Sequence, residues 1–249
     1  MNSTIETILA HRSVRKFKKQ PLTTEQIETI VRCAQSASTS SFIQAYTIIG
    51  VTDKEKKQKL AELSGNQPYV AENGHFFVFC ADLYRHEVIG EIEGRDVIPS
   101  LESTEKFMVS LIDTALAAQN AVIAAESMGL GICYIGGLRN RLEEVKALLQ
   151  IPERVIPLFG LAVGYPDQET DKKPRLPLHH VYQENLYNSD KEKIQKDLEE
   201  YNKVVANYYK ERTGGVREDT WTGQMSNMLS RRVRMYMKEF VEKQKMDLR

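Results

Sequence analysis

The chain has 249 residues, 41% of them hydrophobic and 27% charged, which is enough for one substantial domain with a buried core or for one domain with an extension. Lysine and arginine (34) balance aspartate and glutamate (34), which disfavours non-specific nucleic-acid binding, because that function needs an excess of cations. The sequence shows no run of 18 apolar residues and no secretion-signal pattern, so we expect a cytoplasmic protein without a membrane partner.

Two helices are expected before residue 41. Ser3 and Thr23 each precede a Glu or Gln by three residues, which is the spacing of a capping box, and apolar residues follow at helical intervals. The second helix runs into the hydroxyl-rich segment 36–41, whose side chains compete with the backbone for hydrogen bonds. This segment therefore favours a loop.

Two strands and a surface helix are expected next. The compact apolar runs at 45–51 and 76–80 are typical of buried strands. Between them, Asp53 is placed to begin a lysine-rich helix and Gly65 to end it.

Residues 104–128 predict the most apolar helix of the chain. Apolar side chains occupy more than one of its faces, which is typical of a helix at the centre of a domain or in a subunit contact. Gly129 would end this helix, and the apolar runs 131–135 and 155–163 predict two further strands. Asn140 predicts the cap of a helix between these strands.

The composition changes towards the C-terminus. From Ser189, which is placed as a helix cap, the sequence predicts two long charged helices separated by Gly214 and Gly215. We therefore expect an α+β core at residues 1–178 and a helical extension at residues 179–249.

The cysteines and histidines do not form a recognisable metal motif. Cys33, Cys80 and Cys133 are scattered among apolar neighbours, which is typical of reduced core residues. His179 and His180 are adjacent but have no acidic or cysteine partner at ligand spacing in the sequence. We therefore expect no bound metal.

A cationic cluster follows the first predicted helix. His11, Arg12, Ser13 and Arg15 offer two guanidiniums, a hydroxyl and an imidazole, and arginine forks match the oxygens of a phosphate monoester. Taken alone, the cluster fits a phosphate site and a solvated basic turn equally well. A second basic segment contains Lys173 and Arg175; alone it favours an exposed loop, but together with the first it is consistent with a two-part phosphate site.

Two further segments have the character of a site for a flat ligand. Residues 134–137 (Tyr-Ile-Gly-Gly) end a predicted strand, and consecutive glycines let the backbone approach a ring closely. The glycines just before this strand, Gly129 and Gly131, do not form a Rossmann dinucleotide fingerprint, because residue 134 is Tyr instead of Gly and because they follow a helix instead of linking a strand to a helix. The loop 38–41 and the segment 66–69 are polar turns by themselves, although the Gln67 amide could both donate and accept at a flavin pyrimidine edge.

In order and spacing, several segments together resemble the nitroreductase superfamily, and among its subgroups the NADPH-dependent nitroreductases and flavin reductase P proteins. The resemblance covers essentially the whole chain and rests on HRSVR, SASTSSFIQAY, GNQPY, AQNAVIAAESMGLGICYIGGLRN, PLFGLAVGYP, KPRLP and ERTGGVREDTW. It implies an α+β, nitroreductase-like FMN-binding fold, with a central mixed or antiparallel sheet surrounded by helices. It also implies a homodimer whose C-terminal helical extension wraps the dimer and contributes to the NADPH and substrate side.

The resemblance also implies the roles of individual residues. The positions that would bind FMN non-covalently are His11, Arg12, Ser13, Arg15, Thr39, Gln67, Tyr69, Tyr134, Ile135, Gly136, Gly137, Lys173 and Arg175. Those that would recognise the NADPH 2′-phosphate are Arg212 and Arg217, and those on the substrate side are Ser41, Phe42 and Arg234. Thr39 stands where relatives often carry Ser, and Glu218 stands at a position that is sometimes basic.

The implied activity is that of an NADPH-dependent nitroreductase or FMN reductase. FMN would take hydride from NADPH, or less favourably NADH, and pass electrons to nitroaromatics, quinones or free flavin in a ping-pong cycle without a catalytic acid–base pair. The residues themselves leave open a flavin-binding sensor that does not turn over and an enzyme for a phosphate ligand without flavin. They argue against a purely helical scaffold, because strands are expected.

Overall fold

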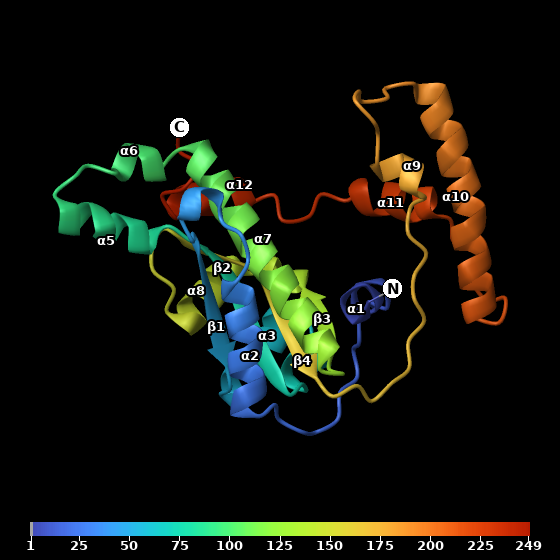
Figure 1. The fold of residues 1–249 in the computed structure, drawn as a ribbon, viewed down its shortest axis with the longest axis horizontal. Coiled ribbons are helices and arrows are strands. Elements are labelled where there is room, and N and C mark those ends of the chain that lie inside the picture. The colour runs from blue at the N-terminus through green and yellow to red at the C-terminus, as the bar shows by residue number, and fades with distance from the viewer. Residues whose placement is uncertain (1) are drawn as a thin grey trace. The chain divides into compact units, whose positions relative to one another are not determined.

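The structure is a computed structural model that describes residues 2–249, and its strands form a four-stranded antiparallel sheet (Figure 1). Its order is β1–β2–β4–β3, and the strands are β1 (Tyr46–Val51), β2 (His75–Asp82), β3 (Gly131–Ile135) and β4 (Val155–Gly164). Each hydrogen-bonded pair is antiparallel, so the sheet follows the antiparallel form of the predicted α+β class. The four predicted strand segments are confirmed, with ends that differ by at most two residues.

Helices form most of the remaining structure. The α-helices are α1 (Ser3–Leu9), α2 (Thr24–Gln35), α3 (Lys54–Leu63), α4 (Pro68–Ala71), α5 (Tyr84–Glu93), α6 (Ile98–Leu101), α7 (Thr104–Ser127), α8 (Leu142–Leu149), α9 (Leu178–Val181), α10 (Lys191–Arg212), α11 (Trp221–Leu229) and α12 (Met237–Lys243). Two 3₁₀ turns, η1 (Ser40–Phe42) and η2 (Gly136–Asn140), follow α2 and β3.

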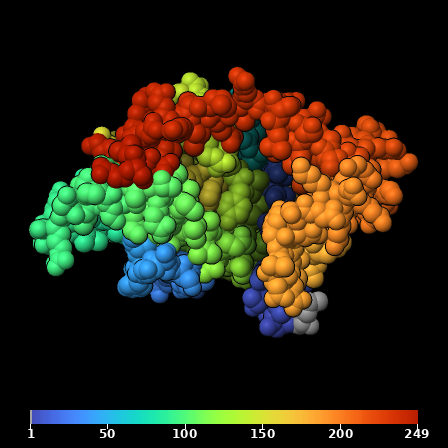
Figure 2. All heavy atoms as spheres, turned by 90° about the horizontal axis from the view of Figure 1, so that it is seen from above, coloured from blue at the N-terminus to red at the C-terminus, as the bar shows by residue number. Residues whose placement is uncertain are grey.

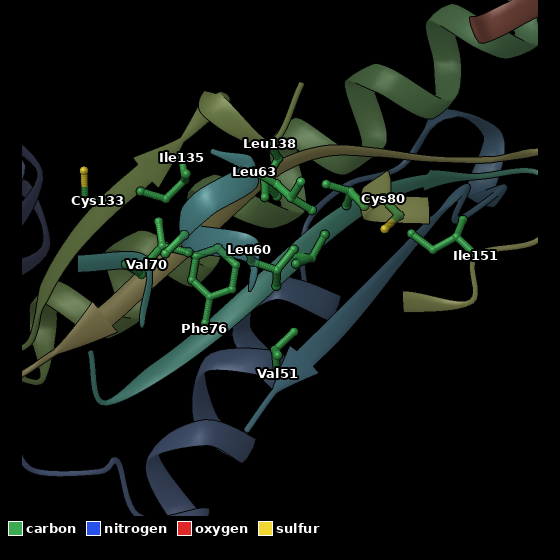
Figure 3. Close-up of a cluster of buried hydrophobic side chains, with 14 of the residues drawn as sticks. Val51, Leu60, Leu63, Val70, Phe76, Cys80, Cys133, Ile135, Leu138 and Ile151 are labelled. Atoms are coloured by element: carbon green, nitrogen blue, oxygen red, sulfur yellow. The ribbon is translucent and has the colours of Figure 1, made fainter. Parts of the chain in front are cut away.

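The central strand β2 is buried on both faces of the sheet. Because side chains alternate along a strand, Phe76, Val78 and Cys80 enter one core cluster while Phe77 and Phe79 enter another. The first cluster lies between the sheet and helices α3 and α8, and Figure 3 shows its side chains converging from both layers. The second lies under α2 and α7, which run side by side on the opposite face (Figure 1). Helices therefore cover both faces of the sheet.

Helix α7 has one buried side and one exposed apolar side. Its alanines, including Ala117, Ala121 and Ala125, are buried against α2 and the sheet. Met108, Ile112 and Leu116, four residues apart, are about half exposed. By length and mean hydropathy (1.5) α7 would suit a membrane span, but half of that window is buried inside the protein. Of the two predicted settings for this helix, the exposed stripe favours a subunit contact.

Some predicted helix caps are confirmed. Thr23 and Gln26 make both hydrogen bonds of a capping box at α2, and Asp53 caps α3 by accepting from the backbone of Lys56. After α7, Gly129 has a left-handed φ of 74°, which a glycine adopts without strain.

Other predicted caps are wrong. The cap of α1 is Asn2, one residue before the predicted Ser3, and the cap of α10 is Asp190, one residue after Ser189. Asn140 does not cap α8, which follows Arg141 without a side-chain cap, because the Asn140 carboxamide oxygen accepts hydrogen bonds from Arg234.

The chain divides into two compact units. One contains the described residues through Thr170 together with Arg234–Arg249, and the other contains Asp171–Val233. This division differs from the predicted boundary at residue 178, because the last sixteen residues pack with the sheet and not with the helical unit. The second predicted charged helix is also two short helices, α11 and α12.

A buried arginine holds the C-terminal segment against the rest of the unit that contains the sheet. Arg154 is 2% exposed; it donates to the Glu87 carboxylate (3.0 Å) and to the carbonyl of Lys245 (2.8 Å), and lies 3.6 Å from Glu102. The Arg249 carbonyl accepts from the backbone of Thr104. In the space-filling view the red C-terminal residues lie directly against the green segment of α6 and α7 (Figure 2).

Candidate active site

The predicted cationic cluster runs beside strand β3. Ser13 forms a parallel bridge with Ile132, and the backbone N–H of Val14 donates to the Ile132 carbonyl at 2.8 Å. A Cβ at Gly131 would lie 2.8 Å from the side chain of Val14, so this close approach requires glycine. The pairing places segment 11–15 along the strand that leads into the twin glycines.

Arg15, Tyr69, Gln67 and Gly137 form one contiguous group. Burial raises the pKa of Tyr69, and the nearby Arg15 guanidinium partly opposes that shift. The Tyr69 hydroxyl donates to the Gln67 carboxamide oxygen, and the Gln67 amide donates to the carbonyl of Ser64 at 2.5 Å. A Cβ at Gly137 would lie 2.5 Å from the Gln67 amide nitrogen, so only glycine allows the backbone to pass there. The structure thus brings together three predicted segments that are far apart in sequence.

Two guanidiniums in this region are not neutralised. Among residues 2–249, no carboxylate lies within 4.0 Å of Arg12 or Arg15. Arg15 and Tyr69 line a cavity of about 660 Å³ in which cations outnumber acids: its wall also carries Lys16, Lys18 and Lys19 against Glu72 and Asp167, and Asp167 pairs with Lys16 at 3.3 Å. A cavity with this charge is suited to an anionic group such as phosphate.

His11 differs from the other members of the cluster because it already has an acidic partner. Its Nδ1 lies 2.8 Å from a carboxylate oxygen of Glu126 on α7. Burial, together with this carboxylate, raises the pKa of Tyr134, whose ring meets Phe159 edge-on at 5.3 Å. Sequence reasoning missed Glu126, which no local motif marks.

The loop that carries Thr39, Ser41 and Phe42 contains strained residues and is hydrogen-bonded to helix α7. Ser41 and Phe42 have φ values of 49° and 58°, which non-glycine residues rarely adopt. Asp113 of α7 is fully buried, and its two oxygens accept from the backbone of Ser40 and Ala45, each at 3.0 Å. Sequence reasoning missed Asp113, although a lone acid in the apolar run SLIDTALAA is a usable signal.

The predicted substrate residue Arg234 lies against the turn that follows β3. Its Nε and one Nη donate to the Asn140 carboxamide oxygen at 3.0 and 2.9 Å. The hydroxyl of Tyr236 donates to the Arg139 carbonyl at 2.7 Å and accepts from the backbone of Leu142 at 3.1 Å. Tyr236, which sequence reasoning also missed, therefore fixes the C-terminal segment to η2.

The second basic segment lies in the other unit, where an aromatic cluster holds it. The Tyr201 hydroxyl donates to the Pro174 carbonyl at 3.1 Å, and Trp221 packs edge-on against Tyr201 at 5.8 Å. Lys173 and Arg175 flank Pro174 and line a cavity of about 310 Å³ within this unit. That they share one phosphate with Arg15 stays a prediction.

The two predicted NADPH arginines differ in their surroundings. Arg217 pairs with Asp219 at 2.6 Å and stacks on the Tyr209 ring at 4.5 Å. Arg212 donates to the Tyr208 hydroxyl at 3.0 Å, and among residues 2–249 no carboxylate lies within 4.0 Å of it. Arg212 is thus the better placed of the two to accept a phosphate.

Comparison with protein families and known proteins gives a consistent result. Residues 8–165 match the Nitroreductase family, and residues 173–249 match the C-terminal domain of the same family. A protein of Bacillus subtilis named FMN reductase (NADPH) is 58% identical over 242 residues, which is 97% of each chain. An NADPH-dependent oxidoreductase of Staphylococcus saprophyticus is 46% identical over 235 residues, covering 94% of this chain and 93% of the relative.

Solved structures show the same similarity. NfrA1 of B. megaterium superposes with a TM-score of 0.98 at 66% identity, covering 99% of this chain and all of the other. The NADPH:FMN oxidoreductase of Vibrio harveyi, solved in complex with NAD⁺, gives a TM-score of 0.90 at 40% identity, with full coverage of both chains.

Proposed function

The chain belongs to the nitroreductase family, and from this premise we propose that it is an FMN-dependent oxidoreductase that takes hydride from NADPH. Relatives named FMN reductase and NADPH:FMN oxidoreductase support this cofactor and this donor. The observation that carries the proposal is the convergence of Arg15, Tyr69 and Gln67 on the glycine turn after β3.

The residues present fit FMN chemically. The phosphate of FMN needs cations, and Arg12 and Arg15 are free of carboxylate partners in the described chain. The flavin ring is flat and needs a backbone that can approach it, which the glycines at 136 and 137 provide. We assign the remaining predicted FMN contacts on the same basis: His11, Ser13, Thr39, Tyr134, Ile135, Lys173 and Arg175.

The chemistry that FMN supplies when bound is two-electron transfer from NADPH to an acceptor, which we propose to be a nitroaromatic, a quinone or free flavin in a ping-pong cycle. The role of the protein is to bind and orient the cofactor, NADPH and the acceptor. Arg12 and Arg15 hold the phosphate, and Glu126 orients His11. Arg212 would bind the 2′-phosphate that distinguishes NADPH from NADH.

We also propose a homodimer formed through α7. The stripe of Met108, Ile112 and Leu116 is apolar and half exposed, as a subunit contact requires. In this arrangement residues 179–249 contribute to the NADPH and substrate side, and Ser41, Phe42 and Arg234 contact the acceptor.

The decisive experiment is an absorption spectrum of the pure protein with FMN, recorded before and after anaerobic NADPH. An enzyme binds FMN and loses its visible flavin absorption rapidly when NADPH is added, and a nitroaromatic or quinone then restores that absorption. A flavin-binding sensor would remain coloured in NADPH. A protein that takes up no FMN from an excess would exclude the proposal.

The phosphate assignment has its own test, in the double variant Arg15→Ala/Lys173→Ala. Two lost charge-assisted hydrogen bonds, each contributing about 1.5–3 kcal/mol, should weaken FMN binding by a factor of about 10² or more while the fold is retained. Lys56→Ala/Lys203→Ala, two exposed lysines of the two units, is the matched control. Equal FMN affinity of the two double variants would refute the assignment.

A further inference from the structure

His179 and His180 of α9 have an acidic neighbour in the fold. The spacing of residues in the sequence does not predict a metal site there. Asp197 lies on α10, 17 residues after His180 in the sequence, yet its Oδ2 is 3.7 Å from the Nε2 of His179. The sequence prediction rested on the lack of a partner at ligand spacing, and the fold supplies an acidic partner from a more distant position. All three residues belong to the same unit, 171–233.

The three side chains present a compact set of ligand atoms. One ring nitrogen of each histidine and one carboxylate oxygen of Asp197 lie within 4.8 Å of one another. The two imidazole rings are tilted by 53° to each other with their centroids 4.6 Å apart, so the two side chains are neighbours. Ligand atoms of a tetrahedral zinc ion are separated by about 3.3 Å, given bond lengths near 2.0–2.1 Å, so small side-chain rotations would close the set.

A second observation points independently to a ligand. The Nε2 of His180 is shielded from solvent and has no hydrogen-bond partner among residues 2–249. Leaving a buried polar atom unpaired costs about 1–3 kcal/mol, so native structures rarely retain one without a reason. A cation bound at Nε2 would give this atom a partner and would also neutralise the Asp197 carboxylate.

We propose that His179, His180 and Asp197 bind one divalent transition-metal ion, with Zn²⁺ as the best match. Two imidazoles and one carboxylate are a ligand set that zinc and its neighbours in the first transition row prefer, whereas Mg²⁺ and Ca²⁺ prefer oxygen alone. Three protein ligands leave at least one position for water. The ion fixes α9 to α10, two elements joined by the connection 182–190, which has no regular secondary structure.

The test is calorimetric titration of the full-length, FMN-loaded protein, without an affinity tag, with Zn²⁺. One ion should bind per chain, and Co²⁺ in its place should give the visible absorption of a site with nitrogen and oxygen ligands. His180→Ala and Asp197→Asn should each weaken Zn²⁺ binding by more than about tenfold, because even the loss of a residue that only supports a ligand has an effect of that size. Glu200→Gln removes one exposed carboxylate from the same helix and should bind Zn²⁺ like the parent.

Thermal stability gives a second readout, which depends neither on the heat of binding nor on the absorption of Co²⁺. Zn²⁺ should raise the unfolding temperature of the parent and of Glu200→Gln, but not of His180→Ala or Asp197→Asn. Circular dichroism of the metal-free variants checks that each is folded; if His180→Ala is not, Asp197→Asn alone decides. Binding that is unchanged in a folded site variant, or a parent that binds no Zn²⁺ at millimolar concentration, would overturn the proposal. Neither result bears on FMN binding, which is measured separately.

Discussion

Asp113 is a buried residue whose hydrogen bonds support the loop that carries Ser41 and Phe42. Its two oxygens accept from the backbone at both ends of the strained segment that carries Ser41 and Phe42. Those left-handed conformations cost about 1–3 kcal/mol each, so they persist only where other contacts impose them. The carboxylate offers two acceptors to two donors, which no other side chain of the same shape does.

Asp113→Asn should therefore loosen this loop. The carboxamide keeps one acceptor but turns an NH₂ group towards a backbone N–H, which costs about 1–3 kcal/mol. If the loop contacts the acceptor, KM for a nitroaromatic should rise several-fold while KM for NADPH and the FMN content stay unchanged. Glu105→Gln, an exposed position of the same helix, is the control. Acceptor kinetics identical to the parent in a folded Asp113→Asn would show that Asp113 has only a structural role.

Arg212 and Arg217 should contribute unequally to the choice of NADPH. Arg217 already pairs with Asp219, whereas Arg212 contacts only the Tyr208 hydroxyl and ring in the described structure. Arg212→Ala should raise KM for NADPH by about tenfold or more, the equivalent of one charge-assisted hydrogen bond, and leave KM for NADH unchanged. Arg217→Ala should have the smaller effect. Steady-state kinetics with both nucleotides separates the two, and equal effects of Arg212→Ala on NADPH and NADH would count against 2′-phosphate recognition.

The residues of the candidate site differ in how visible they are in sequence. Arg15 and Gly137 belong to short motifs whose chemistry is local, so sequence indicates them. Glu126 and Tyr236 act on His11 and on the Arg139 carbonyl through contacts that span 115 and 97 residues. Such partners depend on the packing of whole elements, and no local pattern encodes them.

At the scale of elements, buried strands were the easiest to predict. The run FFVFC of β2 is apolar throughout, which only a strand buried on both faces tolerates. Helix starts were harder, because Asn2 and Ser3, or Ser189 and Asp190, are adjacent and both suitable caps. Which of the two adjacent residues caps the helix depends on the backbone conformation, and the residue types alone do not decide it. The short helix α12 was missed because its anchors, including Phe240 and Val241, are few and widely interrupted by charges.

Arg154 contacts the chain just after α12, so substituting this arginine tests how strongly the C-terminal segment is held. Removing the buried Arg154 leaves the Glu87 carboxylate without its cation and leaves Glu102 with Arg249 alone; breaking a buried charge network in this way costs about 3–5 kcal/mol. Arg154→Ala should lower the free energy of unfolding by that amount in urea titrations. Arg249→Ala breaks a pair whose arginine is 58% exposed and should lower it by at most about 1 kcal/mol. A similar effect of the two substitutions would contradict the central role of Arg154.

At the scale of the whole molecule, the two-part organisation was visible in the composition but its boundary was not. The predicted core, residues 1–178, ignores that the last sixteen residues return to the sheet unit. A chain that leaves a domain and comes back leaves no local signal at the point of return. Only the buried contacts of Met246 and its neighbours with the core reveal it.

The stability of the whole protein should fall in mild acid because of His75. Burial, with the nearby Lys57 charge, lowers the pKa of His75 from 6.5 to about 4. Between these values the unfolded chain binds a proton that the folded chain does not, so the free energy of unfolding decreases as pH falls from 6.5 to 4, by up to about 3 kcal/mol. Urea titrations of His75→Gln should show a flatter pH dependence in this range, with His86→Gln as the control. A slope equal to that of the parent would contradict this origin of the acid sensitivity.

The proposed self-association through α7 is also tested at the scale of the whole molecule. Ile112 is 52% exposed at the centre of the stripe formed with Met108 and Leu116, so a partner subunit would bury it. Ile112→Glu would place an unpaired charge in that contact and should give a monomer at concentrations where the parent is a dimer, as sedimentation equilibrium can measure. Ile92→Glu, at an isoleucine of α5 that is 73% exposed, should remain a dimer. If the dimer completes the flavin site, the Ile112→Glu monomer should also lose FMN, whereas a parent that sediments as a monomer would exclude the dimer itself.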